Sequence, residues 1–136
     1  MDPRPTLADQ INLPDVVAEV TAVFERYEAA LVANRVEELI ELFWDDPRTV
    51  RLGIDEELYG FDEIARYRRT QAIATPPRSL RNTVVTTFGA DVATVDTEFL
   101  PDGSDTIGRQ SQTWIRTADG WRVANAHVSW HAGQRP

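Results

Sequence analysis

The last predicted strand of the chain carries polar side chains at every second position. Asn125, His127 and Ser129 alternate with small apolar residues between positions 120 and 130. Side chains two residues apart share one face of a strand, so the three polar groups lie on the same side. An imidazole with a pKa of about 6.5 can act as an acid or a base at neutral pH. This polar row either faces water or lines a pocket, and His127 fits a structural histidine between strands as well as a functional one.

Further polar groups lie on the strand that precedes this row. Gln112 offers a donor and an acceptor, and Arg109 lies on the same strand with the opposite parity. His127 and His131 are four residues apart, but no carboxylate cluster accompanies them, so we expect no metal site. The sequence contains no phosphate-binding loop and no dinucleotide fingerprint. We therefore expect any reaction to be independent of a cofactor.

Tyr27 lies on the apolar stripe of a predicted helix. It follows Phe24 by three residues and precedes Leu31 by four, so its ring enters the core while its hydroxyl needs a partner. One interpretation is a core tyrosine bonded to a backbone carbonyl. The other is a tyrosine at a cavity mouth that donates a proton, with a pKa of about 10 that falls if an arginine is close.

Arg51 lies between two apolar residues of a short predicted strand. If Val50 and Leu52 face the core, the arginine faces solvent or the rim of a cavity. A solvated arginine is the ordinary case. The functional interpretation is a carboxylate clamp, because the planar guanidinium holds a carboxylate by two hydrogen bonds.

Composition narrows the class of protein. The chain has 136 residues, which suits a single domain, and a formal net charge of −8. All 14 basic residues are arginines and none of them cluster, so we expect no nucleic-acid partner. No apolar run is long enough to span a membrane and no signal peptide is evident, so we expect a cytoplasmic protein without membrane attachment. The absence of cysteine and lysine excludes thiolate and Schiff-base chemistry.

The predicted elements are helices followed by strands. Residues 1–10 are predicted to be a flexible tail, and residues 11–136 a single α+β domain. Helices are predicted at 14–34, 36–43 and 61–72, a short strand at 49–52, a loop at 53–60, and an antiparallel meander at 80–88, 92–100, 106–116 and 121–130. A curved sheet wrapped over the long first helix leaves a cone with a pocket at its open end.

The chain resembles the nuclear transport factor 2-like superfamily of cystatin-like cones, which includes SnoaL-type enzymes. The matching features are the helix with Phe24 and Tyr27, the Asp-Gly-Trp turn at 119–121 and the ending at 125–129. A narrower set of segments resembles the AtzH-like family over residues 11–129. These segments are INLP at 11–14, RYE at 26–28, LFW at 42–44, PRTVR at 47–51, LYG at 58–60, LRNTV at 80–84, GRQ at 108–110 and QTW at 112–114.

The resemblance implies a function. A member of the AtzH-like family is a decarboxylating amidohydrolase that converts 1,3-dicarboxyurea to allophanate in cyanuric acid catabolism. Its essential tyrosine and arginine correspond to Tyr27 and Arg51 of this sequence. We therefore predict a hydrolase of a small anionic amide in nitrogen catabolism, with these two residues catalytic. The predicted substrate-binding residues are Gln112, Asn125, His127, Ser129 and Arg109.

A second hypothesis is a noncatalytic ligand-binding or assembly subunit. Alternation along the strands predicts that Trp114 or Trp121 lies on the outer face of the sheet, where it would favour a homodimer. Proteins similar to this one are linked to amidases, so the resemblance also implies a neighbouring amidase as partner.

Overall fold

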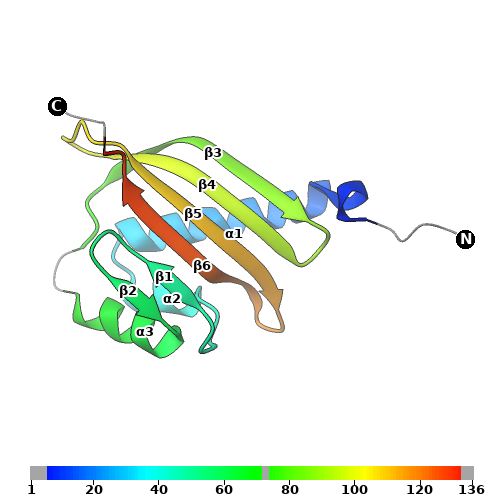
Figure 1. Cartoon of the computed structure of the whole chain (residues 1–136), viewed down its shortest axis with the longest axis horizontal. Coiled ribbons are helices and arrows are strands. Elements are labelled where there is room, and N and C mark those ends of the chain that lie inside the picture. The colour runs from blue at the N-terminus through cyan, green and yellow to red at the C-terminus, as the bar shows by residue number, and fades with distance from the viewer. Residues whose placement is uncertain (1–5, 72–73, 133–136) are drawn as a thin grey trace, which may run out of the picture.

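The computed structural model describes residues 6–71 and 74–132. These residues form a short 3-10 helix η1 (Leu7–Gln10), the helices α1 (Pro14–Val32), α2 (Val36–Glu41) and α3 (Phe61–Thr70), and one six-stranded sheet. The strands are β1 (Val50–Leu52), β2 (Glu57–Tyr59), β3 (Arg78–Phe88), β4 (Val92–Pro101), β5 (Gly108–Thr117) and β6 (Gly120–Trp130). The predicted α+β class is confirmed, with α1 lying along one face of the sheet (Figure 1). Within the described residues, no helix is long and apolar enough to cross a membrane.

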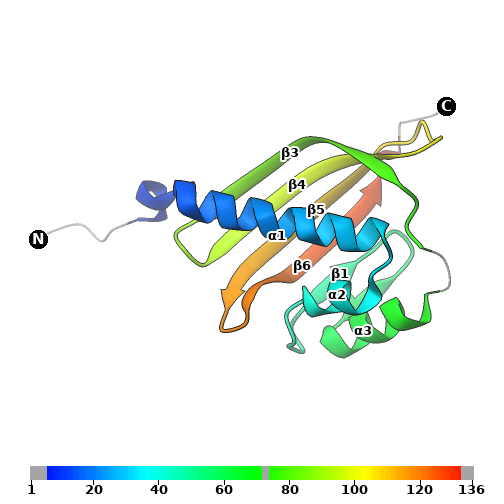
Figure 2. The same ribbon diagram turned by 180° about the vertical axis from the view of Figure 1, so that it is seen from behind.

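The helix α1 forms where its sequence predicts it. Pro14 occupies the first turn, where a missing N–H costs nothing, and Asp15 stabilises the positive end of the helix dipole. Asn34, with a φ of 56°, follows the helix in the left-handed conformation that asparagine tolerates. The buried stripe packs onto the sheet, and the view from behind shows α1 crossing this face of the sheet (Figure 2). It consists of Val16, Val20, Phe24, Tyr27, Ala30 and Leu31.

The sheet is larger than the predicted meander. Strands β3 to β6 pair antiparallel in sequence order, as predicted, but β1 adds to β6 in parallel and β2 pairs antiparallel with β1. The prediction of a loop at 53–60 is wrong for Glu57–Tyr59, which form β2. This strand has only three residues and no apolar run of its own. Its pairing with β1 stabilises it. As a result β1 is paired on both sides.

Two irregularities change which residues of β6 and β3 face the helix. The β5–β6 register shifts between Thr113 and Trp114, where Ala124 is an extra residue on β6. Val123 is buried before the shift and Ala126 after it, so the inward parity of β6 changes from odd to even. A second shift lies between Arg81 and Val84 on β3. Such bulges bend the strands and re-aim the side chains that follow.

The amino-terminal segment contains a short helix that its sequence does not suggest. Residues 7–10, which the composition predicts to be flexible, form η1, and Ile11 bridges to Phe88. The Asn12 backbone N–H donates to the Thr87 carbonyl at 3.0 Å. Residues 1–5 of the predicted tail lie outside the described residues.

Both tryptophans expected on the outer face are buried instead. Trp114 is 0% and Trp121 is 6% exposed, and both belong to the core between α1 and the sheet. The expectation of an outward tryptophan is therefore wrong. The even residues of β5 face inward throughout, whereas on β6 Trp121 precedes the bulge and shares the inward face with Val123.

Gly108 gives a test of the packing at the open end of the cone. It lies opposite Phe99, and a Cβ at Gly108 would come within 2.0 Å of the Phe99 Cζ. We expect Gly108→Ala to destabilise the fold by about 1–3 kcal/mol through overpacking, as measured by denaturant unfolding. The exposed Ser111→Ala on the same strand should change stability by less than about 0.5 kcal/mol. Adding Phe99→Leu to Gly108→Ala should recover part of the lost free energy of unfolding, because the smaller side chain makes room for the new Cβ. If the two substitutions instead lower the free energy of unfolding additively, there is no clash between these residues.

Candidate active site

A cavity of about 290 Å³ lies between the carboxyl-terminal half of α1, α3 and the end of the sheet. Residues from α1, β1, the β1–β2 turn, α3 and β3 to β6 line it. Its polar and charged lining includes Tyr27, Arg51, Glu56, Tyr67, Arg68, Arg78 and Gln110. The pocket predicted at the open end of the cone is thus present, and its walls are charged on several sides.

Tyr27 lines this cavity with a fixed ring. The residue is 2% exposed, and its ring meets Phe43 and Trp114 edge to face, at centroid distances of 5.9 and 6.0 Å. These contacts place the ring in the core, as its position on the apolar stripe predicts. A hydroxyl carried by so constrained a ring has little freedom in where it points, which favours a defined role at the cavity.

Arg51 enters the cavity from β1 and is already paired. Its Nη1 donates to the Glu56 carboxylate, and its guanidinium lies 5.8 Å from the centre of the Tyr67 ring. The Arg51 and Glu56 side chains are only 11% and 18% exposed. Gly53 donates its N–H to the Glu56 carbonyl at 2.8 Å, and this contact closes the β1–β2 turn that holds the carboxylate beside the arginine.

The pair shifts the acid–base properties of this wall. Burial by itself would raise the pKa of Glu56, but hydrogen bonding and charge from Arg51 lower it on balance, with help from Asp55 and Tyr67. The pKa of Tyr67 is raised by burial and by the Glu56 charge, and Arg51 opposes that rise. Glu56 is therefore ionised and Tyr67 is protonated at neutral pH.

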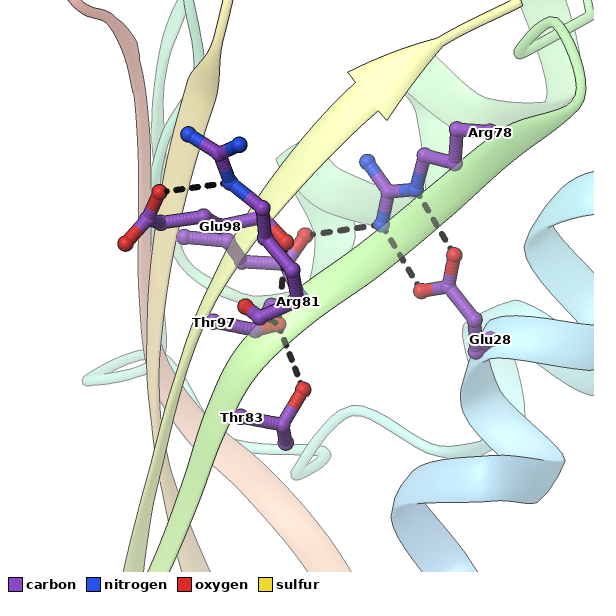
Figure 3. A network of polar contacts seen from close by, with 7 residues as sticks. Glu28, Arg78, Arg81, Thr83, Thr97 and Glu98 are labelled. Atoms are coloured by element: carbon purple, nitrogen blue, oxygen red, sulfur yellow. Dashed lines mark hydrogen bonds and ion pairs between the residues drawn. The ribbon is translucent and has the colours of Figure 1, made fainter.

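Arg78 forms hydrogen bonds with residues of two neighbouring elements. Its Nε and Nη2 each donate to a different oxygen of Glu28 at 2.7 Å, and Nη2 also donates to the Gln110 side-chain oxygen at 3.1 Å. Figure 3 shows Arg78 on β3 and Glu28 on α1 pointing toward each other. The guanidinium also lies 4.3 Å from the centre of the Phe99 ring. This bidentate pair, with Arg78 only 5% exposed, connects the helix to the sheet.

Arg68 on α3 differs from the other two arginines. It is 6% exposed, and within the described part of the chain its Nε and Nη2 have no hydrogen-bond partner. Burial lowers its pKa, Tyr27 opposes this effect, and the nearby Arg51 charge adds to the lowering. An arginine nevertheless stays protonated in proteins. Arg68 is thus a cation at the cavity wall whose charge the described residues leave uncompensated.

The buried polar atoms without a partner at this cavity are all donors. In the described ranges they are Nε of Arg51, Nε and Nη2 of Arg68, and Nε2 of Gln110. The orientation of the Gln110 amide is fixed because Arg78 donates to its oxygen. A set of unpaired N–H groups suits a ligand rich in acceptor oxygens. Over residues 6–71 and 74–132, no group of three or more histidine, aspartate or glutamate side chains is placed to hold a metal ion.

Of the sequence-predicted site residues, the structure brings only Tyr27 and Arg51 together at the cavity. Gln112 is buried, but its side-chain oxygen accepts from the Trp114 indole N–H at 3.0 Å, away from the cavity lining. The others lie on the outer face of the sheet. Asn125, His127 and Arg109 are exposed there, and half-buried Ser129 accepts from Arg109 at 3.3 Å.

The bulge at Ala124 explains this outward row. After it, Ala126 and Val128 face the interior, so the alternating polar residues face away. Val128 and Trp130 contribute the β6 part of the cavity lining instead.

Sequence reasoning missed four charged residues of the cavity, namely Asp55, Glu56, Arg68 and Arg78. Arg68 left a signal, because it follows Ile64 by four residues and Phe61 by seven on the buried stripe of α3. Arg78 precedes Leu80 by two residues on one strand face, but its burial depends on Glu28, which is 50 positions away. Glu56 lies in a turn without any periodic pattern, so only the folded chain reveals its pairing with Arg51.

The lowered pKa of Glu56 predicts a pH-dependent contribution to stability. A carboxyl group with a lowered pKa in the folded state stabilises the fold above its unfolded pKa of about 4.3, and the contribution is lost as pH falls through the folded value. Glu56→Gln should therefore melt below the parent at pH 7, and the gap should close as pH falls below about 4. Thermal melts from pH 7 to pH 3 measure this, with the exposed Glu57→Gln following the parent throughout. A gap that stays constant over that range would contradict the assignment.

The comparisons with known proteins agree with this architecture. The AtzH-like family model matches residues 9–134. A protein of unknown function from the DUF3225 family of Pectobacterium atrosepticum is 51% identical, with a TM-score of 0.89 over 93% of this chain and 99% of that one. A cystatin-like fold protein from Burkholderia xenovorans is 50% identical, with a TM-score of 0.84 over 88% and 95% of the two chains.

A more distant match shows the fold alone. An NTF2-like protein of unknown function from Pseudomonas putida is 18% identical, with a TM-score of 0.71 over 85% of this chain and 86% of that one. The comparison with curated proteins gave no match. The resemblance seen in the sequence, to both the cone fold and the narrower family, is confirmed. The chain belongs to the AtzH-like family.

Proposed function

We propose that this protein is a small, cofactor-independent decarboxylating amidohydrolase that acts on a carboxylated urea or a similar small anionic amide. By family resemblance the substrate is 1,3-dicarboxyurea and the product is allophanate. The observation that carries the proposal is the meeting of Tyr27 and Arg51 at one cavity of about 290 Å³, although they are 24 positions apart on α1 and β1. Family membership supports the same pair.

In the proposed step the bond between a urea nitrogen and its carboxylate breaks. The carboxylate carbon leaves as CO₂, and the bonding electron pair stays on the nitrogen. Tyr27 donates its phenolic proton to that nitrogen, and the phenolate regains a proton from water. The products are CO₂ and the shortened urea carboxylate, and one proton is consumed in each turnover. Proton donation matters because a neutral amide nitrogen is a far better leaving group than its anion.

Arg51 would orient the substrate during this step. Its Nη1 is held by Glu56, while its buried Nε has no partner in the described part of the chain. Glu56 therefore fixes the direction of the guanidinium and leaves a donor for a substrate oxygen. A positioned donor in a site with little water contributes more than the same group in solution.

Tyr67 is the other phenol at the cavity, but its surroundings are less suited to proton donation. Burial and the Glu56 charge raise its pKa, and both make loss of the proton harder. Tyr27, by contrast, is held by the apolar rings of Phe43 and Trp114, and it lies near the Arg68 cation.

We also expect the protein to act in the cytoplasm, with a neighbouring amidase as partner. The burial of Trp114 and Trp121 removes the surface tryptophan on which the expected homodimer and the assembly hypothesis depended. A purely noncatalytic role therefore has no specific observation in its favour, whereas the paired residues of the cavity favour an enzyme.

Tyr27→Phe is the sharpest test of the proton donor. The change keeps the ring contacts with Phe43 and Trp114 and removes only the hydroxyl. We expect the fold to survive and turnover of freshly prepared 1,3-dicarboxyurea to fall by about 10² or more, as measured by CO₂ release. Near-normal turnover in Tyr27→Phe would show that the tyrosine is structural, and no acceleration by the parent would exclude this substrate.

Arg51→Lys separates positioning from charge. Lysine keeps the positive charge but loses the planar fork, so we expect KM to rise and kcat to fall. His127→Gln is the matched control, because His127 is exposed on the outer face of the sheet and should leave both constants unchanged. A larger loss in His127→Gln than in Tyr27→Phe would move the acid–base role to the histidine.

A further inference from the structure

We propose that Arg68 is the residue that selects an anionic ligand for this cavity, by pairing its guanidinium with a carboxylate of the ligand. The chemistry of the ligand rests on the proposed function, but the binding role does not require turnover. Arg68 contacts the same cavity as Tyr27 and Arg51. The short segments that carry the resemblance in the sequence do not include it.

Arg68 is buried where a charged residue is costly. It occupies a position of the α3 stripe that Ile64 and Ala65 share, and it is 6% exposed. Two of its nitrogens are unpaired within the described residues. Burying an uncompensated cation lowers stability, and arginine does not escape this cost by losing its proton. An anionic ligand would supply the missing partner.

The other two arginines of the cavity have their charges neutralised. Glu28 holds Arg78 by two hydrogen bonds of 2.7 Å, and Glu56 holds Arg51. A ligand carboxylate close to either of them would also be repelled by the resident carboxylate, so Arg51 keeps only its Nε as a donor for an oxygen of the substrate. Arg68 faces no such competitor among the described residues, so the anion should bind there first.

Gln110 completes the donor set. Its oxygen is occupied by Arg78, which leaves its Nε2 as a buried donor of fixed orientation. A carboxylate has about four acceptor positions on its two oxygens, whereas an amide of the same shape brings an NH₂ group that would face donors. Leaving buried donors unpaired is unfavourable, so the cavity should reject the neutral amide.

Malonate and its neutral diamide malonamide test this selectivity without turnover, because they share a carbon skeleton and differ in charge. Isothermal titration at pH 7.5 should show that the parent binds malonate and not malonamide. Arg68→Gln should weaken malonate binding by about 30-fold or more. Arg69→Gln is the matched control, since the next residue of α3 is an exposed arginine that pairs with Glu37 on the surface. It removes the same charge and should leave malonate binding unchanged.

The melting temperature without ligand separates a binding role from a structural one. If Arg68 is kept for a ligand, Arg68→Met should melt at the same or a higher temperature than the parent, because it removes an unpaired buried cation. A lower melting temperature would show that the arginine supports the fold and would overturn the proposal. Failure of the parent to bind malonate, or undiminished binding by Arg68→Gln, would overturn it as well. If the parent binds malonate as expected but does not turn over dicarboxyurea, only the proposed reaction is refuted.

Discussion

The structure depends on the neutralisation of charge inside the open end of the cone. Three guanidinium groups, from Arg51, Arg68 and Arg78, line one cavity, where an unpaired charge is costly. Glu28 pairs with Arg78 and thereby fixes α1 against β3, which also fixes the position of Tyr27 one residue earlier on the helix. Among the described residues, two carboxylates are paired with these three cations. The cation without a carboxylate partner, Arg68, is the one that we propose binds an anionic ligand.

At this site apolar packing positions the tyrosine, whereas ion pairing positions the arginine. Trp114 and Phe43 hold the Tyr27 ring from two sides, so the phenol is positioned without any charged group. The β1–β2 turn holds Glu56, which in turn directs Arg51. Because these supports come from different elements, a substitution in one of them should disturb one function of the site and leave the other largely intact.

The bulge on β6 decides which residues of that strand can reach the cavity. Without the extra residue at Ala124, the strand β6 would present either Trp121 and Val123 or the later apolar residues to the core, but not both sets. The bulge lets the apolar residues of both halves of the strand face the core, and it places His127 on the outer face. A histidine that composition makes the obvious acid or base is thereby separated from the cavity, and a tyrosine is left as the candidate proton donor.

The sequence by itself determined the fold class and the elements other than η1 and β2, because periodicity and turn chemistry are local. The stripe of α1, the meander of β3 to β6 and the left-handed Asn34 all follow from near neighbours along the chain. Tertiary structure alone decided the lining of the cavity. The facing of β6 depends on a bulge, and the pairing of Arg78 joins residues 50 positions apart. Such contacts are set by the free energy of packing and charge neutralisation in the whole domain, for which local sequence carries no signature.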